Sequence, residues 1–522
     1  MAGTALLLAL IAGILGVERL SVGQFGFSNP LVASTIVGIA LGNVQMGITI
    51  GITLQLIWMG VVGIGAAVPP DVVIGSVLAT SFAILTGQGA EVALAIAVPV
   101  AIAAQTLDIF VRTINSGLTH WAERKIDEGK VDAVVWANVA GIILMFLRSF
   151  LVVYPAIYFG VDAVKSVVSN IPSVITVGLQ AAGGMLPALG FGMLLNMVGI
   201  PKLFPYFFVG FVAATFMKVP LVGVAILGAA AAFLHDYFLY RDEPLTAGEV
   251  GASTDSSSRF LSKPELRKLV WRQFFLQSAW NFERMQNLGW AFVVLPALKK
   301  FYRNDPEKLK AAVKRNLEFF NTQPYMAAPI LGISLAMEEG VVRGEVAPES
   351  ISAFKVATMG PLAGVGDSLF WMTIRPICLG IGIALAQGGN IIGPIVSLVL
   401  FNIPHLWTRY YPFVKGYELG VSFLATIKSG IKRVTESLSV LGMMVLGAMT
   451  ATMVSISTKA TLQIGQASVG LQSVLDAILP NLLPLALTWV CYRVLKKGTS
   501  PTKVLFTLLI LGILGALVGF FK

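Results

Sequence analysis

Charged residues are scarce in this chain. Of its 522 residues, 12% are Asp, Glu, Lys or Arg, whereas 56% are hydrophobic and the mean hydropathy is +0.81. Soluble domains carry about 25% charged residues, so the composition excludes an ordinary soluble protein. Charge-free runs that can cross about 30 Å of hydrocarbon recur, for example at residues 437–458 and 504–521. These runs are apolar throughout rather than alternating, which predicts an all-α polytopic membrane protein.

Cysteine and histidine are also rare. Cys378 and Cys491 lie in apolar surroundings without a CxxC spacing, and we interpret both as packing residues rather than redox or metal-binding groups. The three histidines are scattered, and no metal-binding spacing such as HExxH occurs. The sequence therefore predicts no metal, no other cofactor and no phosphohistidine within this chain.

The net charge of +10 is unevenly distributed, and much of it lies between residues 241 and 315. Cytoplasmic loops of membrane proteins carry an excess of Lys and Arg, so we expect the charged block 241–322 on the cytoplasmic side of the lipid bilayer. No aromatic-basic module accompanies the block, and nucleic acid is not an expected partner. Residues 1–17 are apolar without a basic region or cleavage site, which favours a first span over a removed signal.

A small, polar stretch divides the chain. Residues 251–258 read GASTDSSS, and we predict a flexible linker at 241–261 between one membrane unit at 1–240 and another at 262–522. The second unit opens with the capping-box spacing Ser262-Lys-Pro-Glu265, which predicts the start of a helix. This N-terminal region of the second unit is amphipathic and charged, and membrane spans follow it.

The two units show signs of being repeats. Three pairs of residues recur at an offset of 296 or 297 positions: Asp71 and Asp367, Arg112 and Arg409, and Pro187 and Pro484. Internal repeats with Gly/Pro-interrupted segments are typical of alternating-access transporters, whose substrate site lies at the repeat interface. The alternative is a chance similarity between unrelated hydrophobic segments, and the sequence leaves parallel and inverted repeats equally open.

Asp71 is the only charged residue between Arg19 and Glu91, and it follows the Gly/Pro-rich run 63–70. A carboxylate at the centre of a spanning helix costs at least about 2.5 kcal/mol, so such a residue often marks a substrate or ion path. The two prolines disfavour a continuous helix, which predicts a broken or re-entrant helical hairpin. We expect Asp71 to contact the substrate; the alternative is that it caps a helix beginning at Val72.

Asp367 is the corresponding acid of the second unit. It ends the string MGPLAGVGD and is the only charged residue between Lys355 and Arg375. We expect a second broken helix here, with Asp367 as a further substrate contact. Two structural alternatives are equally open: Asp367 caps a helix beginning at Ser368, or Arg375 neutralises it.

Neutral polar side chains interrupt the apolar runs of the first unit. Gln24, Gln55 and Gln105 each offer donors and an acceptor suited to sugar hydroxyls, although any one of them could instead join two helices. With one acid they predict a site for a neutral polyol. Asp108 and Arg112 have the i, i+4 spacing of a structural ion pair.

Two segments of the second unit, SAWNFERMQN at 278–287 and EFFNTQPY at 318–325, crowd aromatic, amide and charged residues together. An amphipathic helix usually separates these classes by face, so this mixture favours an interface or a substrate gate. The candidate substrate contacts in these segments are Asn281, Glu283, Arg284, Asn321 and Gln323.

Longer strings carry a family resemblance. GAAVPPD ending at Asp71 and VRTI at 111–114 resemble enzyme IIC of the mannose family of the bacterial sugar phosphotransferase system. The second unit resembles enzyme IID of the same family through four strings: SAWNFERMQ at 278–286, LEFFNTQP at 317–324, MGPLAGVGD at 359–367 and TRYY at 408–411.

The resemblance implies a sugar translocase of the bacterial cytoplasmic (inner) membrane. Such a permease moves a hexose or amino sugar inward by alternating access, coupled to sugar phosphorylation by the phosphohistidine of a soluble IIB partner that works with IIA. A homotrimer of the IIC–IID unit is also implied. On this hypothesis Asp71 orients the reacting hydroxyl or takes its proton, and Asp71→Asn abolishes uptake without affecting assembly.

Two departures from the family pattern accompany the resemblance. IIC and IID are usually separate chains, so the linker reflects either a natural or an engineered fusion, and Gln55 stands where some relatives have Glu. Two alternatives of other classes are an ion- or proton-coupled secondary transporter that does not phosphorylate its substrate, and a receptor or scaffold that does not transport.

Overall fold

The structure is a computed structural model that describes residues 1–61, 68–87, 89–169, 173–198, 201–239, 259–420, 423–464 and 467–520. Most of the run 63–70 and most of the linker 241–261 lie outside these residues. The described chain is mainly helical, as predicted, with one short antiparallel hairpin in which Thr461 pairs with Gly470.

All regular secondary structure among the described residues of the first unit is helical. Its elements are α1 (Ala2–Leu20), α2 (Pro30–Ala40), α3 (Val44–Trp58), α4 (Val72–Thr86), α5 (Ala90–Asp127), α6 (Ala133–Ser169), α7 (Ser173–Val198), η1 (Pro201–Leu203), α8 (Phe204–Thr215) and α9 (Leu221–Leu239). Residues 2–17 lie within the candidate span α1 (Ala2–Leu20), in agreement with the prediction of a first span.

The second unit begins with α10, whose capping box at Ser262 and Glu265 is formed as predicted. Its elements are α10 (Lys263–Arg272), η3 (Gln273–Phe275), α11 (Asn287–Phe301), α12 (Pro306–Arg315), α13 (Ala327–Arg343), α14 (Pro348–Gly366), the π-helix η4 (Asp367–Ile374), α15 (Arg375–Ala386), η5 (Gln387–Gly389), α16 (Ile392–Leu419), α17 (Phe423–Met453), β1 (Thr461–Ile464), β2 (Ala467–Gly470), α18 (Leu471–Ile478), α19 (Leu482–Lys496) and α20 (Pro501–Leu517).

Long and short apolar helices are combined in the membrane part. Within the described residues, six helical segments are long and apolar enough to span a bilayer, or seven if the pair α18 and α19, bent by 79°, counts as one span. Helices α2, α3 and α4 are apolar but contain only 11 to 15 residues. At a rise of about 1.5 Å per residue they are too short to cross about 30 Å of hydrocarbon. Helices α3 and α4 lie on either side of the predicted break before Asp71, and residues 62–67 of that break lie outside the described part of the chain.

The expected break before Asp367 is wrong. Helix α14 continues into the π-helix η4 and then into α15 without a non-helical residue between them. Pro361 lies inside α14 and is accommodated there. A π-helix has i→i+5 hydrogen bonds, and such segments inside α-helices are frequent at functional sites. The repeat relationship between the two units stays a prediction, because Asp71 precedes a helix whereas Asp367 lies inside one.

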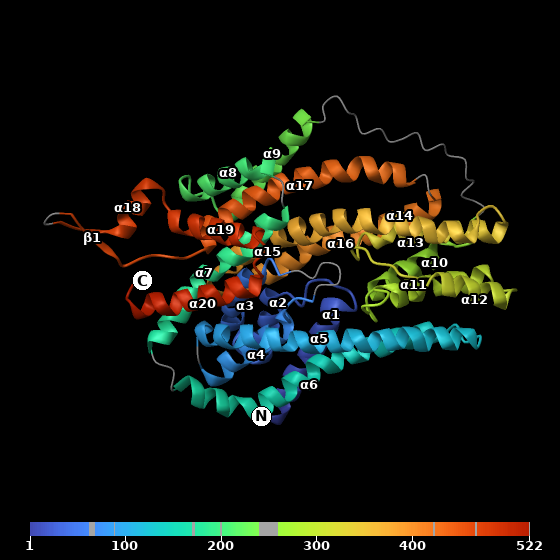
Figure 1. The fold of residues 1–522 in the computed structure, drawn as a ribbon, viewed down its shortest axis with the longest axis horizontal. Helices are drawn as coiled ribbons and strands as arrows, with labels where there is room; N and C mark the ends of the chain where they lie inside the picture. The colour runs from blue at the N-terminus through green and yellow to red at the C-terminus, as the bar shows by residue number, and fades with distance from the viewer. Residues whose placement is uncertain are drawn as a thin grey trace.

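The two units are interlocked rather than placed side by side. Helix α17 of the second unit packs along α8 and α9 of the first, while α7 of the first packs against α19 and α20 of the second (Figure 1).

Small residues permit these crossings. A Cβ on Gly210 would lie 1.9 Å from the Met444 carbonyl oxygen, and one on Gly447 would lie 1.9 Å from that of Phe207. Close backbone approach at glycine is a common basis for helix association in membranes.

Candidate functional site

A cavity of about 260 Å³ lies between the two units. The first unit contributes the end of α1, the loop 21–29, the start of α4, and side chains from α5 and α6. The second unit contributes residues after η3, the segment 321–324 before α13, and side chains along α14, η4, α15 and α16. Binding sites commonly occupy such concave interfaces, where a few polar groups set the orientation of a ligand.

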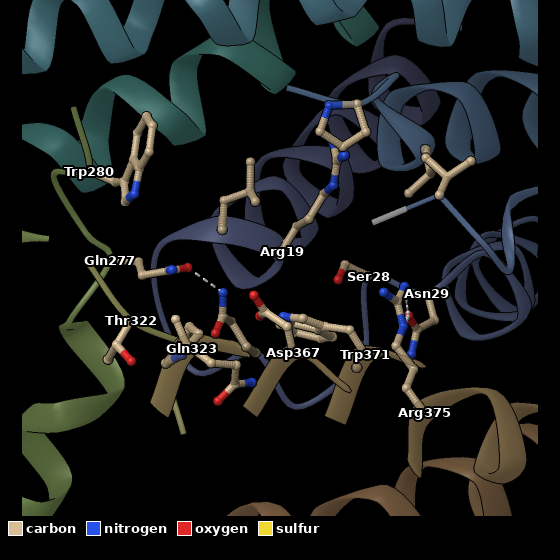
Figure 2. A pocket seen from close by; sticks show the side chains of 18 of the residues that line it. Arg19, Ser28, Asn29, Gln277, Trp280, Thr322, Gln323, Asp367, Trp371 and Arg375 are labelled. Atoms are coloured by element: carbon tan, nitrogen blue, oxygen red, sulfur yellow. Dashed lines mark hydrogen bonds between the residues drawn. The ribbon is translucent and has the colours of Figure 1, made fainter. Parts of the chain in front are cut away.

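Asp367 lines this cavity from the first position of η4 (Figure 2). The side chain is half-buried, and within the described part of the chain no hydrogen bond or ion pair occupies it. The capping alternative is wrong, since helical backbone continues through Asp367. Neutralisation by Arg375 is also not seen: that guanidinium donates to Asn29 Oδ1 at 3.1 and 2.7 Å.

Amide side chains complete this side of the cavity. Gln24 Nε2 donates to Gln277 Oε1 at 2.5 Å, and Gln323 Oε1 accepts from the backbone N–H groups of Tyr325 and Met326. Gln24 Oε1 and Gln323 Nε2 are buried and unpaired among the described residues. Asn321 also lines the cavity and is half-buried. An unpaired acceptor and an unpaired donor together match a ligand rich in hydroxyl groups.

Asp71 lies behind the cavity wall rather than in it. Its side chain is fully buried, and it is absent from the residues that line the cavity. The carboxylate caps α4 by accepting from the N–H groups of Val73 at 3.0 Å and Ile74 at 3.1 Å. It also forms ion pairs with Arg19 at 3.1 Å and Arg148 at 2.7 Å. The capping alternative for Asp71 is therefore confirmed, and its role as a substrate contact stays a prediction.

The Asp71 ion pairs belong to a longer chain of alternating charges. Arg148 also reaches Asp108 at 3.0 Å, and Asp108 pairs with Arg112 at 3.1 Å, as its i, i+4 spacing predicts. The two ends of the chain, Arg19 and Arg112, line the cavity, while its middle is buried. Buried charges in proteins are normally paired in this way because an isolated one is costly. These linked ion pairs therefore hold the two cavity-lining guanidinium groups, those of Arg19 and Arg112, in place.

The other two candidate glutamines do not line the cavity. Gln55 is fully buried, and its Oε1 is 3.4 Å from the Leu31 backbone nitrogen that donates to it. Gln105 Nε2 donates to the Val68 carbonyl at 2.5 Å. Both side chains join separate segments of the first unit, in line with the alternative that such glutamines connect helices.

The polar-aromatic segment 278–287 lies at the contact between the two units. Glu283 Oε2 is 2.8 Å from His120 Nε2, Arg284 pairs with Glu123 through both carboxylate oxygens, and the buried Asn281 donates to Thr119 at 3.3 Å. All three of these partners are on α5. Asn281, Glu283 and Arg284 do not line the cavity, so the interface alternative describes their position.

Several cavity residues were not predicted from the sequence: Arg19, Ser28, Asn29, Arg112, Gln277, Trp280, Thr322, Trp371 and Arg375. Trp280 lies under the Arg112 guanidinium, 4.4 Å from ring centroid to Cζ, which orients both. A detectable signal was that Arg19 and Arg375 each stand at the start of a long charge-free run. Among the described residues, no group of three His, Cys, Asp or Glu side chains is placed to hold a metal ion.

Comparison with known proteins divides the chain where its composition changes. Residues 2–234 match the family described as the sorbose-specific IIC component of the phosphotransferase system (PTS), and residues 260–521 match the mannose/fructose/sorbose family IID component. The chain belongs to the mannose-family PTS permeases. It carries the IIC and IID components of such a permease in one polypeptide, which confirms the resemblance seen in the sequence motifs.

Individual relatives match each half of the permease. The second half is 38% identical over 278 residues to the mannose-specific EIID component of Escherichia coli (strain K12), covering 52% of this chain and 98% of that protein. The first half is 37% identical over 230 residues to the mannose-specific EIIC component of the same strain, covering 44% of this chain and 86% of that protein. The second half is also 39% identical over 268 residues to the fructose permease IID component of Bacillus subtilis (strain 168), covering 50% of this chain and 97% of that protein. The permease is thus a multi-pass membrane component of a PTS sugar transport system.

Proposed function

We propose that the permease binds a hexose or amino sugar in the cavity between its IIC and IID units and moves it inward by alternating access. The observation that carries this proposal is the Asp367 carboxylate, which faces the cavity without a partner among the described residues. A carboxylate that accepts from a hydroxyl forms a strong, charge-assisted hydrogen bond. Gln24, Gln323 and Asn321 supply further donors and acceptors, and the Trp280 and Trp371 rings supply apolar surface for the sugar carbons.

On this proposal, a soluble partner protein provides the phosphoryl group for the sugar. Phosphoryl transfer depends mainly on positioning and on stabilisation of charge. The permease therefore needs only to hold the reacting hydroxyl while a phosphorylated IIB protein, supplied by IIA, provides the phosphoryl group. Asp71 acts indirectly in this scheme, because it anchors Arg19, whose side chain lines the cavity.

We place the charged block, of which residues 259–322 are described, on the cytoplasmic side of the inner membrane. Helices α11 and α12 of this block pack against α6 and α5, respectively (Figure 1). Lysines 299, 300 and 314 form ion pairs there, and the excess of Lys and Arg agrees with the positive-inside bias. We further propose that the permease assembles as a homotrimer, which light scattering in detergent would test.

Transport into sealed vesicles tests the proposed function. Purified permease is reconstituted into vesicles that enclose IIA together with either phosphorylated or unphosphorylated IIB. Labelled hexoses and amino sugars are then added outside. The proposal predicts that label accumulates as sugar phosphate only with phosphorylated IIB. Accumulation of unmodified sugar driven by an ion gradient would instead support a secondary transporter, and no flux with any sugar would contradict both.

A further inference from the structure

The loop that joins α1 to α2, residues 21–29, supplies several cavity side chains, among them Gln24, Ser28 and Asn29. Its backbone follows an unusual course. Gly23, Gln24 and Gly26 all have positive φ angles, of 85°, 59° and 96°. Such angles are readily adopted by glycine but are unfavourable for other residues, so the loop needs specific contacts to keep this shape.

Glu18 provides these contacts from within the IIC unit. Its Oε1 accepts from the Gly26 N–H at 2.7 Å, and its Oε2 accepts from the Ser28 N–H at 2.8 Å. The residue is 8% exposed, lies in the last turn of α1, and is not one of the residues that line the cavity. Both carboxylate oxygens therefore serve as acceptors for the loop backbone.

The IID unit holds the same loop from the opposite side. The Gly23 N–H donates to the Phe274 carbonyl at 2.9 Å, and the Asn402 amide donates to the Phe25 carbonyl at 2.8 Å. The Tyr325 hydroxyl donates to the Gln24 carbonyl at 3.2 Å. These contacts, with the Gln24–Gln277 and Asn29–Arg375 hydrogen bonds (Figure 2), make loop 21–29 the part of IIC that fits into IID.

We propose that Glu18 is a positioning residue for sugar binding, which sets loop 21–29 in the one shape that presents Gln24, Ser28 and Asn29 to the cavity and to IID together. This inference rests on the proposed function of the cavity. A glutamine at position 18 keeps the size of the side chain but directs an NH2 group at one of the two backbone donors. One buried N–H then loses its acceptor, although no cavity atom has been removed.

Kinetics of sugar phosphorylation test this role. For Glu18→Gln we expect KM for the sugar to rise about ten-fold or more, as the loss of one buried acceptor implies, with kcat at saturating sugar little changed. Glu18→Asp retains two acceptors and should recover part of the affinity. Glu128→Gln, an exposed acid at the end of α5, is the matched control and should leave KM unchanged. An unchanged KM for Glu18→Gln, or a fall in kcat alone, would overturn the proposal.

A chemical probe reports on the loop without reference to sugar. Phe27 is 42% exposed, whereas the two native cysteines are buried, so a Phe27→Cys variant gives a labelling site in the loop. Adding Glu18→Gln should speed its reaction with a maleimide, and Glu128→Gln should not. Gly26→Ala, which places a Cβ at φ +96°, should reproduce the faster labelling and the raised KM if Glu18→Gln folds poorly.

The two measurements separate the two claims. Faster labelling of the Glu18→Gln variant, in a permease that phosphorylates no sugar, would support the role of Glu18 in the loop and reject the proposed function. An unchanged labelling rate in a permease with normal sugar kinetics would reject the role of Glu18 and leave the proposed function intact.

Discussion

Arg148 places a guanidinium nitrogen 2.7 Å from a carboxylate oxygen of Asp71, and neither side chain is more than 1% exposed. This contact joins α6 to the start of α4, two segments that carry the wall of the cavity. An acid that stands alone in the sequence is therefore one member of a buried ionic chain in the fold. Its position favours organisation of the cavity wall over direct contact with a sugar.

Asp71→Asn should lower stability as well as uptake. The substitution leaves Arg19 and Arg148 without this counter-charge, and breaking a buried ion pair by removing one partner typically costs about 3–5 kcal/mol. The sequence alone predicts intact assembly, but these partners change that expectation. Thermal unfolding in detergent measures the effect, with Asp132→Asn as the control because that acid pairs with Lys299 at the surface. Equal unfolding temperatures for the two variants would contradict the ionic chain as a stabilising element.

Gly210→Ala should loosen the contact between IIC and IID. The added Cβ would lie 1.9 Å from the Met444 carbonyl oxygen, so α8 and α17 must move apart. Overpacking of this kind costs about 1–3 kcal/mol, and we expect a lower unfolding temperature and easier separation of the halves after cleavage in the linker. Gly117→Ala is the matched control, because its added methyl group would meet nothing within 4 Å. A Gly210→Ala protein as stable as the control would argue against the close helix crossing.

The stabilising contribution of Glu265 to the IID unit should be lost in acid. Its hydrogen bond with Lys300, together with those from Ser262, lowers the pKa of this carboxyl from 4.5 to about 2. A lowered folded-state pKa contributes stability above pH 4.5, and that contribution is lost as the pH falls toward 2. Since both side chains are partly exposed to water, the effect should stay below about 1 kcal/mol. Unfolding midpoints measured from pH 5 to pH 3 should fall less steeply in Glu265→Gln than in the unaltered permease, and parallel slopes would refute the assignment.

Local signals in the sequence predict local features well. The capping box at Ser262 and the ion pair between Asp108 and Arg112 depend on residues three or four positions apart, and both are present. The membrane class likewise follows from composition. Broken helices in the IIC unit are predictable because prolines remove backbone donors.

Long-range partners are not predictable in this way. The sequence favours Asp71 over Asp367 as a sugar contact because Asp71 has no nearby opposite charge in sequence, yet Arg19 and Arg148 reach it from other helices. Arg375 follows Asp367 within the same segment and suggests a structural pair, but that arginine turns toward Asn29. Which charges meet across helices depends on tertiary packing, which a single sequence does not encode in its spacing.

Sugar binding by Asp367→Asn tests the central claim most directly. The substitution preserves shape and removes only the charge of the cavity-facing carboxylate, so stability should be unchanged. A hydrogen bond to a charged group contributes about 1.5–3 kcal/mol, and its loss should weaken sugar affinity about ten- to a hundred-fold. Binding of labelled sugar to purified permease is the measurement, with the thermal unfolding temperature as a control for folding. Loss of affinity at an unchanged unfolding temperature is the predicted result, and normal affinity in Asp367→Asn would contradict a sugar site in this cavity.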